Sequence, residues 1–143
     1  MRRTLLVALL GLVALAVLIQ FVPYGRDHSN PPVLNQTRWD SPSTQALFSK
    51  ACADCHSNQT VWPWYSHIAP ISWLVQHDVA EGRNALNIST GTGEMDDVSK
   101  LIPNGSMPPS VYTLMHPAAK LNRPQQEQLV RGLGATFGLV GEH

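Results

Sequence analysis

The chain has 143 residues, and its ten basic side chains balance its ten acidic ones. A neutral chain with a sequence pI near 7.0 lacks the basic surface that nucleic-acid binding needs, so we expect no nucleic-acid partner. About 110 residues remain after a hydrophobic N-terminus, which suffices for one small domain. Eleven prolines and ten glycines, without long alternating strand patterns, predict an all-α fold of short helices joined by loops.

Residues 1–22 predict a single membrane helix. Thr4–Val22 contains no charged side chain, and a helix of this length extends about 28 Å, close to the hydrocarbon thickness of a bilayer. Arg2 and Arg3 precede it, so the positive-inside rule leaves the N-terminus in the cytoplasm. The alternative is a signal peptide cleaved near Ala14-Leu15-Ala16. We expect an uncleaved anchor, because cleavage there would leave an apolar new terminus. Both alternatives place the domain outside the cytoplasm.

Residues 23–40 predict a linker, and residues 41–143 predict the folded domain. The linker mixes proline, asparagine and charged residues without helical periodicity, and Pro31-Pro32 stiffens it. It should either lift the domain off the membrane or wrap around the surface of the domain. Trp39, near its end, is a candidate for docking at the domain edge.

The first domain helix is predicted to begin at Ser41, as N-cap, with Pro42 in the first helical position. Leu47 lies on its apolar stripe and Phe48 is placed on the flank of that stripe. The helix leads directly into Cys52, so the motif that begins there should lie at the C-terminal end of this helix.

Cys52-Ala53-Asp54-Cys55-His56 is a C-x-x-C-H sequence, the attachment signature of c-type haem. Two thiols three residues apart can each add to a haem vinyl group, and the histidine that follows can bind the iron. These are the two cysteines of the chain, which argues that they share one task. We expect one covalent haem c, with a backbone carbonyl of the 60–70 loop as the partner of the second His56 ring nitrogen.

Three other uses of the cysteine pair are less consistent with the sequence. A disulfide within four residues closes too small a loop to stabilise much. A redox dithiol would be expected at a strand-to-helix junction, and no βαβ pattern is present. Zinc needs four ligands, and no second C-x-x-C or paired histidine motif follows.

The next stretch concentrates aromatic residues in Trp62-Pro63-Trp64-Tyr65. Two roles are possible for Trp62, Trp64 and Tyr65. They pack around an irregular loop, or they form the wall of a haem edge, with an indole N–H or the tyrosine hydroxyl bonded to a propionate.

Arg83 has two interpretations as well. It belongs to a solvated helix face, or it pairs with a propionate.

The downstream helices are predicted from periodicity and caps. A second helix is expected over 71–89 with Ser72 as a possible cap, and a short one over 94–102. A further turn or helix is expected over 110–116. Asn122 should cap a last helix that runs to about 137, in which Gly132 either weakens the helix or allows close helix contact.

Met107 is the predicted sixth ligand of the iron. It stands in a rigid loop, with Gly105 before it and Pro108-Pro109 after it. Glycine lets the backbone approach a ring closely and the prolines stiffen the loop. A methionine in a polar loop has no evident packing purpose. His116 is the second candidate.

The remaining histidines and methionines are not favoured as ligands. His67 and His77 are expected on the proximal side or at the surface, His28 lies in the linker and His143 at the tail. Met95 and Met115 are expected to pack against helices.

Taken together, these motifs resemble the bacterial haem-binding domain family of small c-type cytochromes. The resemblance covers about 30–137 and rests on C-x-x-C-H followed in order by W-P-W-Y and G-S-M-P-P, together with Tyr112 and His116-Pro117. It implies a cytochrome c-like helical fold wrapped around one covalent haem. It also implies a membrane-anchored or exported protein, and it does not indicate a redox partner.

The sequence therefore predicts a monohaem c-type cytochrome, anchored in the bacterial cytoplasmic membrane with its haem domain on the periplasmic side. With His56 and Met107 both bound, the iron has no open position, which suits electron transfer to redox partner proteins rather than catalysis. Two alternatives leave the sixth position open: a peroxidase-like enzyme, and a haem-based sensor or assembly module.

Overall fold

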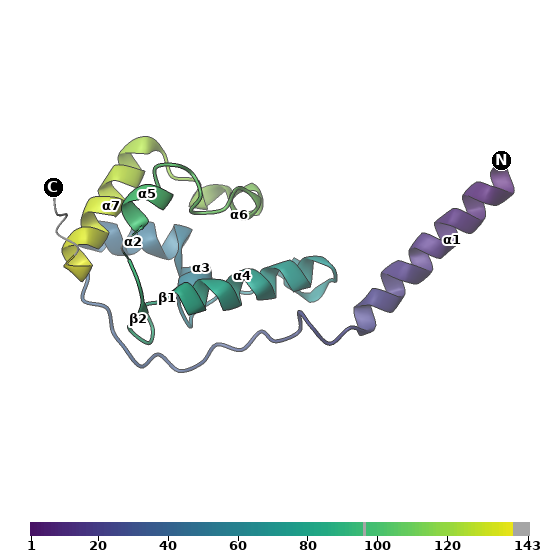
Figure 1. The fold of residues 1–143 in the computed structure, drawn as a ribbon, viewed down its shortest axis with the longest axis horizontal. Coiled ribbons are helices and arrows are strands. Elements are labelled where there is room, and N and C mark those ends of the chain that lie inside the picture. The colour runs from purple at the N-terminus through teal and green to yellow at the C-terminus, as the bar shows by residue number, and fades with distance from the viewer. Residues whose placement is uncertain (96, 139–143) are drawn as a thin grey trace. The chain divides into compact units, whose positions relative to one another are not determined.

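The computed structural model describes residues 1–95 and 97–138, and most of them are helical (Figure 1). This confirms the predicted helical class. Within the described residues, the one sheet is a short antiparallel pair, β1 (Leu86–Asn87) and β2 (Thr92–Gly93), in which Leu86 pairs with Gly93 and Asn87 with Thr92. His143, which was predicted to lie at the tail of the domain, is outside the described residues.

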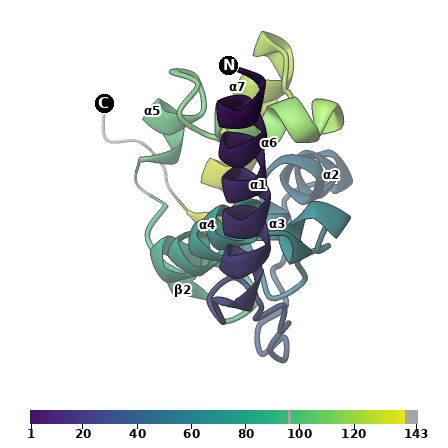
Figure 2. The same cartoon turned by 90° about the vertical axis from the view of Figure 1, so that its right-hand side faces the viewer.

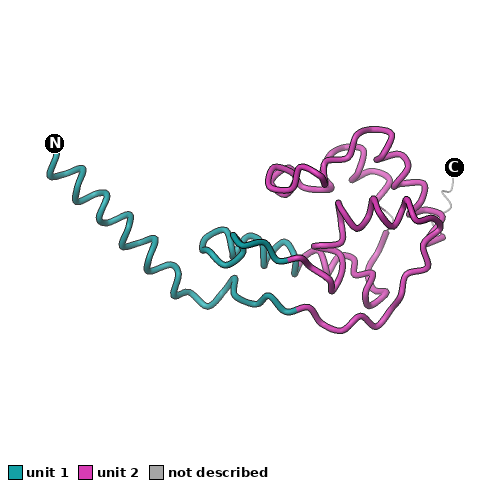
Figure 3. Tube along the Cα trace, turned by 180° about the vertical axis from the view of Figure 1, so that it is seen from behind, with its two compact units in different colours: residues 1–29, 62–80 teal, residues 30–61, 81–143 magenta. Residues whose placement is uncertain are grey.

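The chain divides into two compact units (Figure 3). Unit 1 consists of Met1–Ser29 and Trp62–Ala80, and unit 2 consists of Asn30–Val61 and Glu81–His143. The helix α4 (Ile71–Ala85) contributes its first part to unit 1 and its last turn to unit 2.

Unit 1 contains the predicted membrane helix. Figures 1 and 2 show α1 (Arg2–Leu18) as one continuous helix, which a 3-10 turn, η1 (Ile19–Phe21), extends. No residue of α1 is buried, and Arg2–Phe21 is long and apolar enough to cross a membrane. The unit also contains a second 3-10 turn, η2 (Trp64–His67), and the start of α4.

The two longest helices of unit 2 begin where their caps predicted. Helix α2 (Pro42–Ala51) starts after Ser41, whose hydroxyl accepts a hydrogen bond from the Thr44 backbone N–H at 3.2 Å. Helix α7 (Arg123–Phe137) starts after Asn122. Asn122 forms a capping box with Gln125, which satisfies two backbone N–H groups that a helix start leaves free.

The core of unit 2 lies between α2 and α7. Phe48, which we placed on the flank, is instead 1% exposed and belongs to the core with Leu129 and Leu133. Gly132 explains how closely the two helices approach: a Cβ at this position would lie 2.0 Å from the Thr44 hydroxyl oxygen. The close-contact interpretation of Gly132 is therefore confirmed.

Trp39 docks at the edge of this core, as predicted. Its ring lies 5.1 Å from that of Phe48 and 6.3 Å from that of Phe137, centroid to centroid. The end of the predicted linker therefore packs against the domain.

Helix α4 differs from the prediction at both ends. Helix α4 ends at Ala85, and Ser72 lies inside its first turn instead of capping it. The residues expected to finish the helix form β1 and a turn, because the buried side chains of Asn87 and Ser89 hydrogen-bond to the loop after the cysteine motif. These contacts are distant in sequence, so they override local helical preference.

Shorter helices complete unit 2. Helix α5 (Val98–Leu101) is shorter than expected, whereas α6 (Ser110–Met115) lies where it was predicted and is followed by the 3-10 turn η3 (Pro117–Ala119). Met95 is buried, as expected, but Met115 on α6 is exposed, so its predicted packing role is wrong.

Candidate functional site

The cysteine motif forms one helical turn directly after α2. Cys52 ends α2 and precedes α3 (Ala53–His56), and its carbonyl accepts hydrogen bonds from the backbone N–H groups of Cys55 and His56 at 3.2 and 2.9 Å. Residues three apart on a helical turn lie on the same face. The turn therefore brings the two thiols together, at the end of α2 as expected.

His56 is held by a carbonyl that sequence analysis did not identify. Its Nδ1 lies 3.1 Å from the carbonyl oxygen of Leu86 in β1. The predicted 60–70 loop is therefore not the source of this partner. The physical reason is the early end of α4, since the chain turns at Ala85 and presents the next carbonyl to the ring.

This hydrogen bond determines how His56 can act as a ligand. A carbonyl only accepts, so Nδ1 carries the proton and Nε2 retains its lone pair. Burial lowers the pKa of His56, while hydrogen bonds to the Leu86 and Gly82 carbonyls oppose that shift. A neutral imidazole with a free Nε2 lone pair is the form that binds iron.

A buried polar network holds β1 in place beside His56. The Asn87 side-chain amide donates to Asn58 Oδ1 at 2.8 Å, and the Asn58 backbone N–H donates to the Ser89 hydroxyl at 2.9 Å. The Ile88 N–H also donates to the His56 carbonyl at 3.1 Å. Isolated asparagines and serines are typical of surface turns, so their pattern in the sequence did not predict this buried network.

Gly82 allows α4 to approach the cysteine motif. A Cβ at this position would lie 2.6 Å from the Cys55 carbonyl oxygen and 2.8 Å from Cys55 Cβ. Only glycine permits such an approach without a shift of the backbone. The signal in the sequence was a lone glycine inside a helical pattern.

Cys52, His56 and Met107 line one cavity of about 130 Å³. Its wall is mainly apolar and comes from α2, α5, α7 and the segments beside them. The apolar lining consists of Phe48, Ala85, Leu86, Met95, Val98, Leu101, Ile102 and Leu133. Two acidic residues, Glu94 and Asp97, lie at this cavity as well.

Met107 lies in the loop after α5, and this loop places it at the cavity. Its N–H donates to the Leu101 carbonyl at 2.9 Å, and the loop turns through Gly105 at a φ of +79°. The side chain is 37% exposed. Met107 therefore lines the cavity and is also accessible from solvent.

Burial raises the pKa of the Cys52 thiol to about 12, and the charge of Cys55 adds to the shift. A thiol with so high a pKa stays protonated at neutral pH. Since thiolates are the form that binds metals and exchanges with disulfides, this environment does not favour metal binding or dithiol exchange at Cys52.

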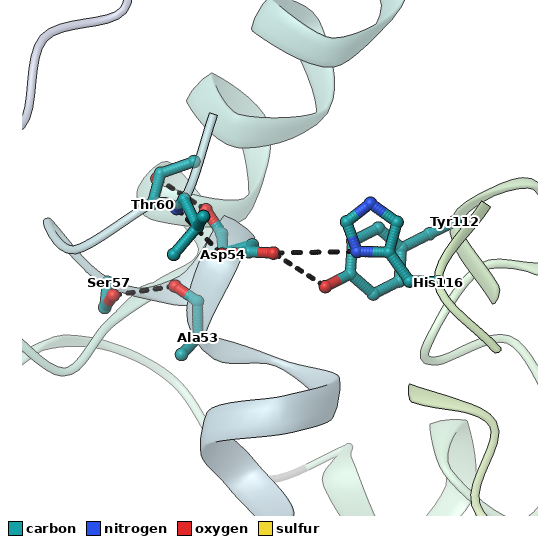
Figure 4. A network of polar contacts seen from close by, with 7 residues as sticks. Ala53, Asp54, Ser57, Thr60, Tyr112 and His116 are labelled. Atoms are coloured by element: carbon teal, nitrogen blue, oxygen red, sulfur yellow. Dashed lines mark hydrogen bonds and ion pairs between the residues drawn. The ribbon is translucent and has the colours of Figure 1, made fainter. Parts of the chain in front are cut away.

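Asp54, which lies between the two cysteines, connects the motif to α6 (Figure 4). Its Oδ2 accepts a hydrogen bond from the Tyr112 hydroxyl at 2.8 Å and lies 3.9 Å from Nδ1 of His116. Its Oδ1 accepts from the Val61 N–H at 2.9 Å. His116, the second candidate for the sixth ligand, thus faces Asp54 and Tyr112, and it is not among the described residues that line the cavity.

Arg83 is half-buried and bonded to the protein. Its guanidinium donates to the Ser57 carbonyl at 2.9 Å and to Asn30 Oδ1 and Thr60 Oγ1 at 3.0 Å. The solvated-face interpretation is therefore wrong, because Arg83 stabilises the loop that follows the cysteine motif. Its pairing with a propionate stays a prediction.

The aromatic cluster belongs to unit 1. Trp64 is strongly exposed and lies edge-on to Tyr65, with ring centroids 5.8 Å apart. Trp62 lies 4.7 Å from the His28 ring, and its buried Nε1 meets no acceptor among residues 1–95 and 97–138. The haem-edge role of these three residues stays a prediction.

A family model described as the haem-binding domain matches residues 14–135, which is most of the chain. The chain belongs to the haem-binding domain family. No curated protein and no solved structure gives a significant match. The family therefore establishes haem binding, and it confirms the family resemblance inferred from the motifs.

The donor set of this haem-binding domain fits a haem. The cavity combines an imidazole whose Nδ1 is already bonded, a thioether sulfur and an apolar wall. Imidazole and thioether are both axial ligands of haem iron. A porphyrin is an apolar macrocycle, so a wall of this kind is the surface that it requires.

Proposed function

We propose that this haem-binding domain protein is a membrane-anchored monohaem c-type cytochrome that carries single electrons outside the cytoplasm. Cys52 and Cys55 would hold the haem through thioether bonds, with His56 and Met107 as axial ligands. The observation that carries the proposal is that His56 and Met107 line the same apolar cavity as Cys52.

The chain's residues have separate roles in this proposal. When bound, a haem supplies an iron that takes up and releases one electron. His56 is oriented by the Leu86 carbonyl, and the apolar wall excludes water from the iron. Met107 would hold the iron from its second side and leave no position open for a substrate, so the role we propose is electron transfer between redox partner proteins rather than catalysis.

Two observations support retention of the N-terminal helix as an anchor. The family match begins at residue 14, inside α1. Gln20, in η1, exchanges two hydrogen bonds with the backbone of Ala69, both at 3.0 Å. A helix end that is bonded to a distant loop behaves as part of the folded protein. With Arg2 and Arg3 on the cytoplasmic side, the haem domain would lie on the periplasmic side of a bacterial cytoplasmic membrane.

The test compares Met107→Ala with Met115→Ala in holoprotein produced with haem-attachment machinery. Met115 is an exposed methionine on α6 that is absent from the lining of the cavity, so it controls for loss of a thioether. We expect the ferric parent and Met115→Ala to be low-spin and six-coordinate. Met107→Ala should become high-spin or water-ligated, with a lower midpoint potential because methionine ligation raises it.

The opposite result would redirect the assignment. A high-spin ferric parent that binds peroxide or carbon monoxide without mutation would favour the open-site alternatives, a peroxidase-like enzyme or a sensor. A haem that is extracted by acid and organic solvent would rule out the thioether bonds to Cys52 and Cys55.

A further inference from the structure

Unit 1 exposes an apolar surface close to the end of the membrane helix. We define the tip as Trp64–Leu74, which comprises η2 and the first turn of α4. Four of its apolar side chains are exposed, by 73% for Trp64, 44% for Ile68, 47% for Ile71 and 44% for Leu74. The last two lie three residues apart on one side of α4, and Ile68 precedes the helix in an extended conformation.

The sequence around the tip carries no formal charge. From Ser57 to His77 there is no aspartate, glutamate, lysine or arginine, and three of the chain's four tryptophans lie between 62 and 73. Tryptophan and tyrosine favour the boundary between lipid and water, because an apolar ring and a polar N–H or O–H can be satisfied together there. A water-facing surface has no physical reason to avoid charge over such a length.

Hydrogen bonds place the tip at the level where α1 would leave the bilayer. The helix Arg2–Phe21 has 20 residues and is about 30 Å long, so Gln20 lies at the outer end of a span. Gln20 is bonded to both the N–H and the carbonyl of Ala69, in the middle of the tip. The backbone of the tip therefore lies beside the end of the anchor.

The chain after the anchor continues along the tip. A Cβ on Gly25 would lie 2.7 Å from the Ser72 hydroxyl oxygen. The Asp27 N–H donates to Gln76 Oε1 at 3.1 Å. His28 Nε2 donates to the Ser66 carbonyl oxygen at 2.9 Å, because a carbonyl only accepts. The start of the predicted linker is thus folded onto the tip and is not a free spacer.

We propose that the tip is a second membrane contact, with Trp64, Ile71 and Leu74 in the lipid headgroup boundary of the outer leaflet. The inference rests on the proposed anchoring by α1. A lipid surface is favoured over a partner protein because the exposed apolar side chains belong to the same compact unit as the anchor, and the Ala69 backbone between them is hydrogen-bonded to Gln20 at the outer end of the anchor. Anchoring at two points would restrict rotation of unit 1 about the axis of α1.

The experiment uses the full-length holoprotein, one copy per nanodisc of phosphatidylethanolamine and phosphatidylglycerol. Trp64→Cys and Leu74→Cys receive a nitroxide label, and collisions with oxygen and with a nickel chelate are measured. Leu114→Cys, an exposed apolar position of α6 in unit 2, is the matched control. Unlabelled parent treated with the same reagent is the blank, and an unchanged haem spectrum shows that each variant is folded.

We expect the ratio of oxygen to nickel collisions to be severalfold higher at both tip positions than at Leu114→Cys. A ratio at the tip equal to that of the control, with easy access to nickel, overturns the proposal. So does low access to both reagents, which would mean that protein covers the tip. A label at Val13→Cys in α1 separates the tip proposal from the anchoring on which it rests. If the label at Val13→Cys is as accessible to nickel as the control, α1 does not span the membrane. If that label is lipid-exposed while the tip labels are accessible to nickel, only the tip proposal is wrong.

Discussion

The histidine of the cysteine motif depends on residues that lie far from it in the sequence. Leu86 supplies the carbonyl that fixes the ring, and Asn87 and Asn58 hold the short strand from which that carbonyl projects. The motif alone identifies His56 as the proposed ligand. Its orientation comes from a strand and a loop that local patterns did not predict, because buried amide pairs leave no periodic signal.

At the residue scale, Asn87→Ala tests this support. Asn87 is 6% exposed, donates to Asn58 and accepts from the Ser89 N–H at 3.0 Å. Losing these bonds leaves buried partners unsatisfied, which should lower the free energy of unfolding by about 1–3 kcal/mol. Denaturant titration of the holoprotein measures this change, and the midpoint potential of the haem should shift as the Leu86 carbonyl loosens.

Asn84→Ala is the control for that measurement. Asn84 belongs to α4, close in sequence, but is exposed. Its replacement should leave both the stability and the potential close to those of the parent. If Asn87→Ala behaves like Asn84→Ala, the strand does not need the amide pair.

Among the elements, those with local start signals were predicted and those fixed by distant contacts were not. Ser41 and Asn122 cap helices within the same turn, so α2 and α7 begin where expected. The end of α4 depends on a polar network with Asn58, which lies 29 residues away from Asn87. The sequence could therefore predict the helices of the core, but not the carbonyl that orients the ligand.

The close packing of α2 against α7 predicts that Gly132→Ala lowers the stability of the protein, whereas most glycine-to-alanine substitutions in helices raise it. Alanine in place of a helical glycine normally stabilises by about 1 kcal/mol. At Gly132 the new methyl group would meet Thr44, so we expect Gly132→Ala to destabilise instead, by about 1–3 kcal/mol. Thermal unfolding followed by circular dichroism measures the change.

Adding Thr44→Ala to Gly132→Ala should recover part of that loss, because it removes the hydroxyl oxygen that the methyl group would meet. A stabilised single variant, or a double variant whose two effects simply add, would mean that the helices can separate slightly without cost.

For the whole molecule, the sequence predicted an N-terminal helix that is long and apolar enough to cross a membrane, and a haem-binding domain. It also predicted that Met107 and His56 would serve one site. Both residues line one cavity, although they are separated by the whole of α4 and α5. The bond between Gln20 and Ala69 could not be predicted, because a single glutamine at the end of an apolar run carries no information about its partner. The same holds for the division into two units, in which α4 contributes to both.

The last prediction concerns the contribution of the haem to the stability of unit 2. The wall of the cavity is mainly apolar, so a bound macrocycle would remove apolar surface from water, which stabilises by about 25 cal/mol for each Å² buried. A small domain has a total stability of only about 5–15 kcal/mol, so this contribution would be a large part of it. Replacing both cysteines, Cys52→Ala with Cys55→Ala, should release the haem and lower the unfolding temperature strongly, with loss of near-ultraviolet circular dichroism. Met107→Ala, which leaves both attachment points intact, should keep most of the stability of the parent. A double cysteine variant that unfolds together with the parent would show that the protein core is complete without the macrocycle.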